Sequence, residues 1–285
     1  MKILAVTNCQ ECCKKNFGFY KLINSWKYFH PNIEIVNWDD KETERIKRDY
    51  KNFDLLSFMP IVMLEAKQRY NADLVIKIDS DSIILDKLTE IIDCNDSTQI
   101  FSVRNDGDHI GNKDEKRNRP PTIRDIPNEK YLNCGLIATN SEQFLKEWYK
   151  YNKNLIEKYG NIENAREVCP MVEQGSYNII AASGKYKVKI LDELGNSLLY
   201  GASANCPSAG NHSCPQSIID EYGGQCNPWA SWKDIEYKNG KFMLYGKIVK
   251  ILHSSGGGSI NCKKLSWDRF NEKLIPILKK ITNEN

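Results

Sequence analysis

The stretch Leu74-Val75-Ile76-Lys77-Ile78-Asp79-Ser80-Asp81-Ser82-Ile83-Ile84-Leu85 decides the fold, because a run rich in β-branched residues leads into two carboxylates. The first five residues are too few for a helix and indicate a strand buried on both faces. In open α/β sheets, ligands bind beyond the carboxyl ends of the strands. We therefore expect a ligand beside these two carboxylates.

Asp79 and Asp81 lie two residues apart and can converge on one ion at a strand end. Carboxylates at this spacing suit Mg²⁺ or Mn²⁺ that carries a phosphorylated substrate. The alternative is a solvated turn between two strands, which leaves the immediate return of apolar residues at Ile83 unexplained. Our interpretation is a nucleotide diphosphate held by a metal ion.

Length and composition are those of an ordinary soluble protein. The chain has 285 residues, 41% hydrophobic and 27% charged, which is enough for one large domain or two small ones. A net charge of +3 without a dense basic block argues against nucleic acid as a partner. The apolar run at the start is too short for a signal peptide, and no stretch approaches a membrane span of about 20 residues. The expectation is a soluble, cytoplasmic chain without a membrane span.

The ten cysteines leave two interpretations open. Cys9, Cys12 and Cys13 form one cluster, whereas Cys206 and Cys214 belong to a second, more dispersed group with Cys226. A chain without an export signal favours free thiols. A zinc site that draws on both groups is the alternative, although the second group lacks the usual ligand spacing.

The first third of the chain reads as a βαβαβ unit, the arrangement of a parallel nucleotide-binding sheet. The pattern predicts strands at 2–7, 33–38 and 74–78, and helices at 19–29 and 53–70, with a charged helical segment up to residue 49.

The remaining chain alternates strands, helices and irregular stretches. Short strands are predicted at 100–103 and 187–191, helices at 141–159 and 172–181, long irregular stretches at 104–130 and 195–232, a hairpin at 242–252 around Gly246, and a final helix at 267–281. A further strand at 131–140 is interrupted by Asn133 and Gly135, and a glycine inside a strand often marks the close approach of a ligand.

Three features now stand in order along the chain: Asp79-Ser80-Asp81 after a strand, Asn133-Cys134-Gly135 in a strand with Glu173-Gln174 opening a helix, and His253 before three glycines. In this order the chain resembles the GT-A glycosyltransferases, particularly the metal-dependent families that include glycogenin and the xyloglucan xylosyltransferases. The resemblance covers about residues 1–267 and is sharp only at residues 79–81.

The resemblance implies an α/β fold of GT-A type and one domain over residues 1–285. A Rossmann-like nucleotide-binding half, 1–103, would join an acceptor half, 104–285, through one continuous mixed sheet; the acceptor half would include a C-terminal metal-ligand segment and helix. The implied activity is transfer of a sugar from a nucleotide-sugar donor, with a UDP sugar expected, to a hydroxyl of a glycan or glycoprotein acceptor.

The same resemblance implies that Mn²⁺ or Mg²⁺ is held by Asp81 and His253. Asp79 would bind the metal, contact the donor ribose, or both, and Ser80 would lie against the donor within the same motif. The physical chemistry agrees, since a divalent ion offsets the charge that develops on a departing diphosphate. His253 could instead be a structural histidine at a strand end.

Further donor contacts are implied at positions that match the family pattern less closely. Gly256 and the two glycines after it would form an anion-binding nest, or a flexible linker. A cation would come from Lys263 or its neighbour Lys264. Thr7, Asn8 and Asp39 would contact the base and ribose.

The reacting sugar would face Asn133, Gly135, Glu173 and Gln174 in enzymes of this kind. In an inverting mechanism Glu173 would be the general base, whereas in a retaining mechanism Glu173 or Gln174 would stabilise an oxocarbenium-like sugar. The sequence leaves both mechanisms open. Glu173 could also be a helix N-terminal acid, and Asn133 a bulge residue with local hydrogen bonds.

Two functions of other classes use the same residues. A nucleotidyl- or phosphotransferase would need a glycine-rich phosphate loop after the first strand, and Asn8-Cys9-Gln10-Glu11-Cys12 is not such a loop. A carbohydrate- or metal-binding module without turnover is the other alternative. It would bind sugar and release no nucleoside diphosphate.

Overall fold

The computed structural model describes residues 1–9, 19–50, 58–94, 97–104, 126, 132–168, 172–191, 197–198, 235–244, 246–253, 267 and 270–284. The first part of the chain forms β1 (Ile3–Asn8), α2 (Phe19–Phe29), β2 (Glu34–Trp38), α3 (Asp40–Asp49), α4 (Met59–Arg69), β3 (Leu74–Ile78), β4 (Ser82–Ile84), α5 (Thr89–Ile92) and β5 (Ile100–Arg104). The later part forms β6 (Leu132–Thr139), α9 (Glu142–Tyr159), α10 (Ile162–Val168), α11 (Val172–Ala181), β7 (Val188–Ile190), β8 (Ser197–Leu198), β9 (Glu236–Lys238), β10 (Lys241–Leu244), β11 (Lys247–Val249), β12 (Ile251–His253), η5 (Glu272–Leu274) and α13 (Ile275–Thr282).

These elements belong to two compact units, which we call unit 1 and unit 2. Unit 1 consists of Met1–Val6, Val36–Lys77 and Asp93–Ile190, and unit 2 of Thr7–Ile35, Ile78–Ile92 and Leu191–Asn285. The predicted organisation as one domain with halves 1–103 and 104–285 stays a prediction.

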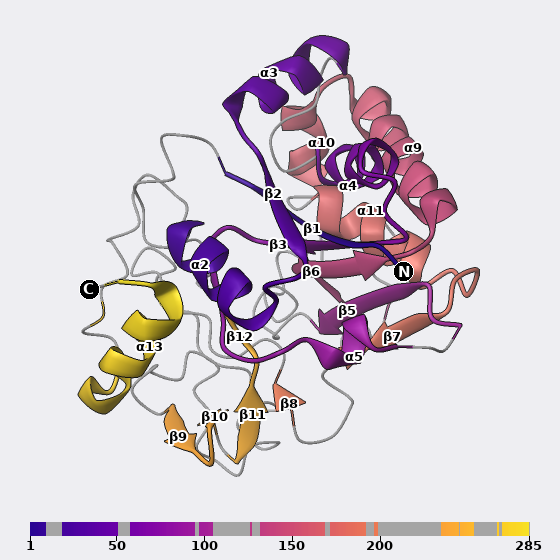
Figure 1. Cartoon of the computed structure of the whole chain (residues 1–285). Helices are drawn as coiled ribbons and strands as arrows, with labels where there is room; N and C mark the ends of the chain where they lie inside the picture. The colour runs from indigo at the N-terminus through magenta and orange to yellow at the C-terminus, as the bar shows by residue number, and fades with distance from the viewer. Residues whose placement is uncertain are drawn as a thin grey trace. The chain divides into compact units, whose positions relative to one another are not determined.

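Unit 1 is built on a six-stranded sheet in the order β2-β1-β3-β6-β5-β7 (Figure 1). β1 and β3 are parallel, β5 and β6 antiparallel, and β5 and β7 parallel, so the sheet is mixed. Every residue of β3 is buried, as the sequence predicts for a strand covered on both faces. The expected mixed α/β architecture is therefore confirmed.

The helices of unit 1 gather around α9, against which α4, α10 and α11 pack (Figure 1). Ser141 begins α9 as predicted, because its hydroxyl accepts a hydrogen bond from the Phe144 N–H at 3.2 Å. Phe144 and Trp148 are fully buried and contact Tyr177 of α11. These aromatic side chains belong to the hydrophobic core of the unit.

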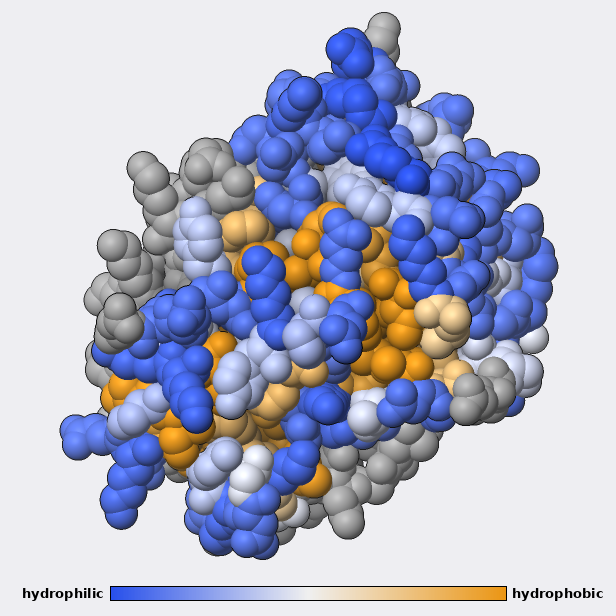
Figure 2. Space-filling view, viewed as in Figure 1, coloured by the Kyte–Doolittle hydropathy of each residue, from blue (hydrophilic) through white to orange (hydrophobic). Residues whose placement is uncertain are grey.

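The exposed side of unit 1 is formed in part by the charged helix α3. Figure 2 shows hydrophilic side chains covering this helix, which matches the charged helical segment predicted up to residue 49. Its Arg45 pairs with Glu42 one turn away and with Glu65 of α4. The side chains of these pairs are partly buried, and Arg45 links α3 to α4.

Unit 2 contains a four-stranded sheet in the order β8-β11-β10-β9 and a two-stranded sheet of β12 and β4. The predicted hairpin around Gly246 is confirmed, because β10 and β11 are antiparallel and Gly246 has a φ of 77°. The apolar continuation after Asp81, which was not predicted as a strand, is β4. It pairs antiparallel with β12.

One strand prediction for unit 2 was wrong, because the strand expected to end near residue 252 is two strands that belong to different sheets. The break lies at Lys250, whose buried ammonium pairs with Glu90 and donates to the Lys87 carbonyl. Its own carbonyl accepts from the Leu85 N–H at 2.8 Å. These bonds to the segment after β4 turn the chain out of one sheet and into the other.

The C-terminal helix also begins later than predicted. A 3-10 turn, η5, precedes α13, which starts with a proline in its first turn. A proline has no N–H to donate and favours a helix start, so the predicted helix over 267–281 is shortened at its beginning. None of the helices in the described ranges combines the length and apolar character needed to cross a membrane.

A buried histidine makes the stability of unit 2 depend on pH. His30 is 5% exposed, and its Nε2 accepts a hydrogen bond from the Leu88 N–H at 3.3 Å, which requires the neutral imidazole. Burial, with help from Lys87, lowers the pKa of His30 to about 4. Because the unfolded chain binds the proton more tightly, stability is complete above pH 6.5 and decreases as the pH falls toward 4.

We expect the free energy of unfolding to fall by about 2 kcal/mol between pH 7 and pH 5 through this histidine. The measurement is urea unfolding at both pH values. His30→Gln keeps a hydrogen-bond acceptor and does not titrate. Between pH 7 and pH 5, its free energy of unfolding should therefore fall by about 2 kcal/mol less than that of the wild type. Equal pH dependence in the two proteins would remove His30 as the cause.

Candidate metal centre

The three predicted metal ligands come from two strand ends and the turn between two strands. Asp79 directly follows β3, Asp81 directly precedes β4, and His253 is the last residue of β12. In the antiparallel pairing of β4 with β12, His253 lies opposite Ser82. The apolar residues of both strands are almost fully buried, which fixes this register and sets the imidazole beside the turn that carries both carboxylates.

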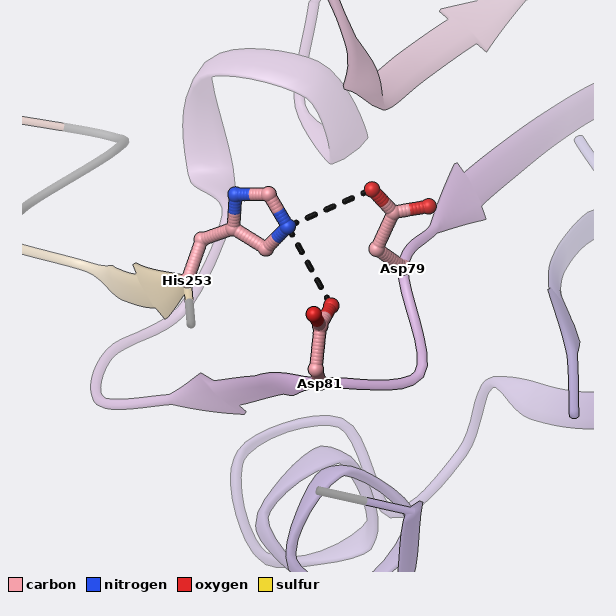
Figure 3. A group of neighbouring side chains, drawn as sticks. All are labelled: Asp79, Asp81 and His253. Atoms are coloured by element: carbon pink, nitrogen blue, oxygen red, sulfur yellow. Dashed lines mark ion pairs between the residues drawn. The ribbon is translucent and has the colours of Figure 1, made fainter. Parts of the chain in front are cut away.

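The side chains converge on one point. His253 Nε2 lies 3.3 Å from Asp79 Oδ2 and 3.2 Å from Asp81 Oδ1, and one ligand atom of each residue lies within 4.8 Å of the others. Figure 3 shows the imidazole nitrogen facing both carboxylates. The His253 side chain is 7% exposed, compared with 16% for Asp81 and 35% for Asp79, so the cluster opens toward Asp79.

The electrostatics of the cluster favour a cation. Burial would lower the pKa of His253, but the carboxylates of Asp81 and Asp79 outweigh burial and raise the pKa to about 9. The two carboxylates therefore favour positive charge at this point of unit 2.

The donor set fits a divalent metal ion. Two carboxylates and one imidazole are ligands that Mn²⁺ accepts, and Mg²⁺ shares the preference for the carboxylates. Among the described residues these three form a group that could hold a metal. The predicted convergence of Asp79, Asp81 and His253 is present in the structure, and the identity of the ion stays a prediction.

Three of the other predicted donor-binding residues of unit 2 lie within the described residues, and they differ in burial. Thr7 is fully buried near the end of β1, Asn8 is half-buried, and Ser80 lies half-buried in the turn between the two aspartates. Gly256 and Lys263 lie outside the described residues. The donor contacts of all five stay predictions.

Asp39, predicted to contact the donor ribose, has a structural role in unit 1. Its side chain accepts from the Glu42 N–H at 3.2 Å and caps the N-terminus of α3. An aspartate before a charged helical segment is a common capping signal, so the sequence could have indicated this role. A donor contact by Asp39 stays a prediction.

Two of the predicted sugar-side residues, Asn133 and Gly135, lie at a bulge in β6. Between Ser102 and Val103 of β5, the partner residue changes from Ile137 to Asn133, so residues 134–136 have no opposite partner on β5. The Ser102 hydroxyl lies within hydrogen-bond distance of the carbonyls of Asn133 and Leu136. Asn133 Oδ1 accepts from the Gly135 N–H at 2.5 Å. The predicted interruption of this strand is therefore a bulge, and the local bonds expected of a bulge residue are present.

Helix α11 carries Glu173 and Gln174, the predicted catalytic pair, in its first turn. Glu173 is 5% exposed and Gln174 3% exposed. The Glu173 carbonyl accepts from Trp148 Nε1 at 3.0 Å, and Gln174 Oε1 accepts from the Cys134 N–H at 3.1 Å. The structure thus joins Gln174 to the bulge, and the catalytic roles of both residues stay predictions.

Sequence reasoning missed two residues of this region. Asn178, one turn after Gln174, donates to and accepts from the backbone of Leu132. Lys77 of β3 donates to the Cys134 carbonyl. A charged residue inside an otherwise apolar buried strand was the signal available for Lys77.

Comparison with known proteins places the fold. No protein-family model matches the sequence, and no curated protein matches it either. Among solved structures, the bifunctional glycosyltransferase WbbM is similar with a TM-score of 0.52 and 13% identity over 88% of this chain. The match covers 45% of WbbM, so this chain spans less than half of that protein.

Two further solved structures match over most of both chains. Galactosyltransferase LgtC has a TM-score of 0.49 and 12% identity, over 98% of this chain and 95% of its own. Mouse xyloside xylosyltransferase 1 has a TM-score of 0.49 and 8% identity, over 91% of this chain and 100% of its own. The mixed six-stranded sheet and the similarity to WbbM confirm the expected α/β fold of GT-A type.

Proposed function

We propose that this protein is a metal-dependent glycosyltransferase, which moves a sugar from a UDP-sugar donor to a hydroxyl group of a glycan or glycoprotein. The observation that carries the proposal is the convergence of Asp79, Asp81 and His253, with ligand atoms within 4.8 Å of one another. A fold shared with the glycosyltransferase WbbM supports sugar transfer as the reaction class. Fold alone would not suffice, because one fold supports many activities.

In this proposal Asp79, Asp81 and His253 hold Mn²⁺ or Mg²⁺. Bound there, the ion offsets the negative charge that develops on the diphosphate leaving group. The imidazole ligand favours Mn²⁺ over Mg²⁺, which prefers oxygen ligands. Asp79 is the most exposed of the three and is thus the ligand best able to contact the donor ribose as well.

The sugar-side roles belong to unit 1 in this proposal. Glu173 is the acceptor's general base in an inverting reaction, and Gln174 or Glu173 stabilises the sugar cation in a retaining one. Asn133 and Gly135 line the sugar pocket, and Thr7, Asn8 and Asp39 contact the nucleoside. The anomeric configuration of the first product, measured by NMR, distinguishes inversion from retention.

Metal-dependent binding of UDP is the first test of the proposal. We expect UDP to bind about tenfold or more tightly in Mn²⁺ than in EDTA, because a divalent ion held by the carboxylates would offset the negative charge of the diphosphate. Calorimetry measures both affinities. Uridine is the matched control, since it lacks the diphosphate and its binding should not respond to the metal.

Equal affinity for UDP with and without Mn²⁺ would leave the proposal without support. A screen of UDP sugars for donor hydrolysis then identifies the sugar. Sugar binding without release of UDP in that screen would favour the non-catalytic binding module instead.

A further inference from the structure

Lys77 is a buried lysine in the central sheet of unit 1. Its side chain lies in β3 and is 4% exposed, and its ammonium donates to the Cys134 carbonyl of β6 at 2.6 Å. Burying an ammonium is costly unless strong hydrogen bonds replace its water. A leucine or methionine would fill this strand position without that cost, so the amine itself has a role to explain.

The residue that Lys77 holds is also the residue that orients Gln174. The Cys134 N–H donates to Gln174 Oε1 at 3.1 Å. Because a backbone N–H can only donate, the oxygen of the Gln174 amide must face Cys134. The NH₂ group of the Gln174 amide then points away from the bulge.

Cys134 lies in the part of β6 without opposite residues on β5, so the ladder to β5 does not hold this segment. Side chains from other elements add contacts to it. Asn178 ties the preceding Leu132 to α11, where it also donates to the Gln174 carbonyl at 2.8 Å. Lys77 supplies the charged contact, on the carbonyl of the same residue whose N–H contacts Gln174.

We propose that Lys77 is a positioning residue for sugar transfer, which fixes Cys134 so that Gln174 presents its amide NH₂ to the donor sugar. The inference rests on the proposed function, in which Gln174 lies beside the reacting carbon. Lys77 acts through Cys134 and Gln174 and does not itself contact the substrate.

The first test needs no activity. Lys77→Met keeps the length and apolar volume of the side chain and removes the donor. We expect hydrogen exchange at the Cys134 amide to become about tenfold faster relative to the Ile76 amide in the same sheet. Lys250→Met is the matched control, because Lys250 is a similarly buried lysine, 6% exposed, that also donates to a carbonyl. It should leave the Cys134 amide unchanged.

The second test is a double-mutant cycle between Lys77→Met and Gln174→Ala. We expect Lys77→Met alone to lower kcat about tenfold, with the KM for the donor unchanged, because the misplaced group acts on the reacting sugar. In the Gln174→Ala background the same change should have almost no effect. A purely structural lysine would instead give additive losses together with a lower melting temperature.

The outcomes separate this inference from the proposed function. Absence of turnover in the wild-type protein overturns the proposed function, and exchange at Cys134 then still reports whether Lys77 holds the bulge. Unchanged exchange, or additive losses in a wild type that turns over, overturns the inference. If Lys77→Met does not fold, Lys77→Arg enters the same cycle, and additive losses there have the same meaning.

Discussion

Asp81→Asn is expected to reduce sugar transfer about a thousandfold while the protein stays folded. The substitution keeps the size of the side chain and removes the negative charge that lies 3.2 Å from His253 Nε2. A neutral amide is a weak ligand for a hard divalent cation, so the charge on the departing diphosphate loses its compensation. The measurement is kcat for the donor at saturating Mn²⁺, with circular dichroism as the check on folding.

Asp49→Asn is the matched control for this experiment. Asp49 ends α3 with a side chain that is 41% exposed, and it pairs with Arg45 and Arg48 on the same helix. Removing an exposed pair of this kind changes stability little, and activity should be unaffected. Full activity in Asp81→Asn would show that Asp81 is not a metal ligand, because this variant would then behave like the control.

Local pattern was enough to predict the two carboxylates of the metal cluster. Asp79 and Asp81 follow a short β-branched run that favours a buried strand, and polar side chains at a strand end can meet. His253 was predicted as a ligand through the resemblance to the GT-A glycosyltransferases, since a histidine at a strand end can equally be structural. Only the structure shows that the three side chains face one another.

The pairing that brings the ligands together could not be predicted in the same way. Residues 248–253 read as one strand, since nothing in that run marks a break except Lys250. The break depends on Glu90 and the Lys87 carbonyl, which lie far away in sequence. A contact of that range leaves no periodic signal, so β11 and β12 are predicted from the sequence as one strand.

Lys77 illustrates the same limit at the sugar-side residues. Its position in a run of β-branched residues predicts the strand correctly but does not predict what its charged group contacts. Its partner is a carbonyl in a bulge whose position depends on how β5 and β6 align. The charge inside an apolar strand marks Lys77 as unusual, but a backbone acceptor carries no residue identity, so its partner could not be predicted from the sequence.

His253→Ala is expected to raise the Mn²⁺ concentration needed for half-maximal activity about a hundredfold. The imidazole is the one nitrogen ligand of the cluster and the most buried, so its loss leaves two carboxylates that repel each other. High Mn²⁺ should restore much of kcat, since both carboxylates remain. A metal titration of activity, with Mn²⁺ and Mg²⁺ in parallel, measures the shift, and the penalty should be larger for Mn²⁺ because Mg²⁺ depends less on nitrogen ligands.

His30→Gln tests whether the effect is specific to the cluster. His30 is the other buried histidine of unit 2 among the described residues. Its Nε2 accepts a hydrogen bond from the Leu88 N–H, whereas His253 Nε2 faces two carboxylates. Its substitution should change the pH dependence of unfolding and leave the metal titration as in the wild type. If His253→Ala and the wild type need the same Mn²⁺ concentration, His253 is a structural residue of the β4–β12 pair. The carboxylates alone would then have to hold the ion.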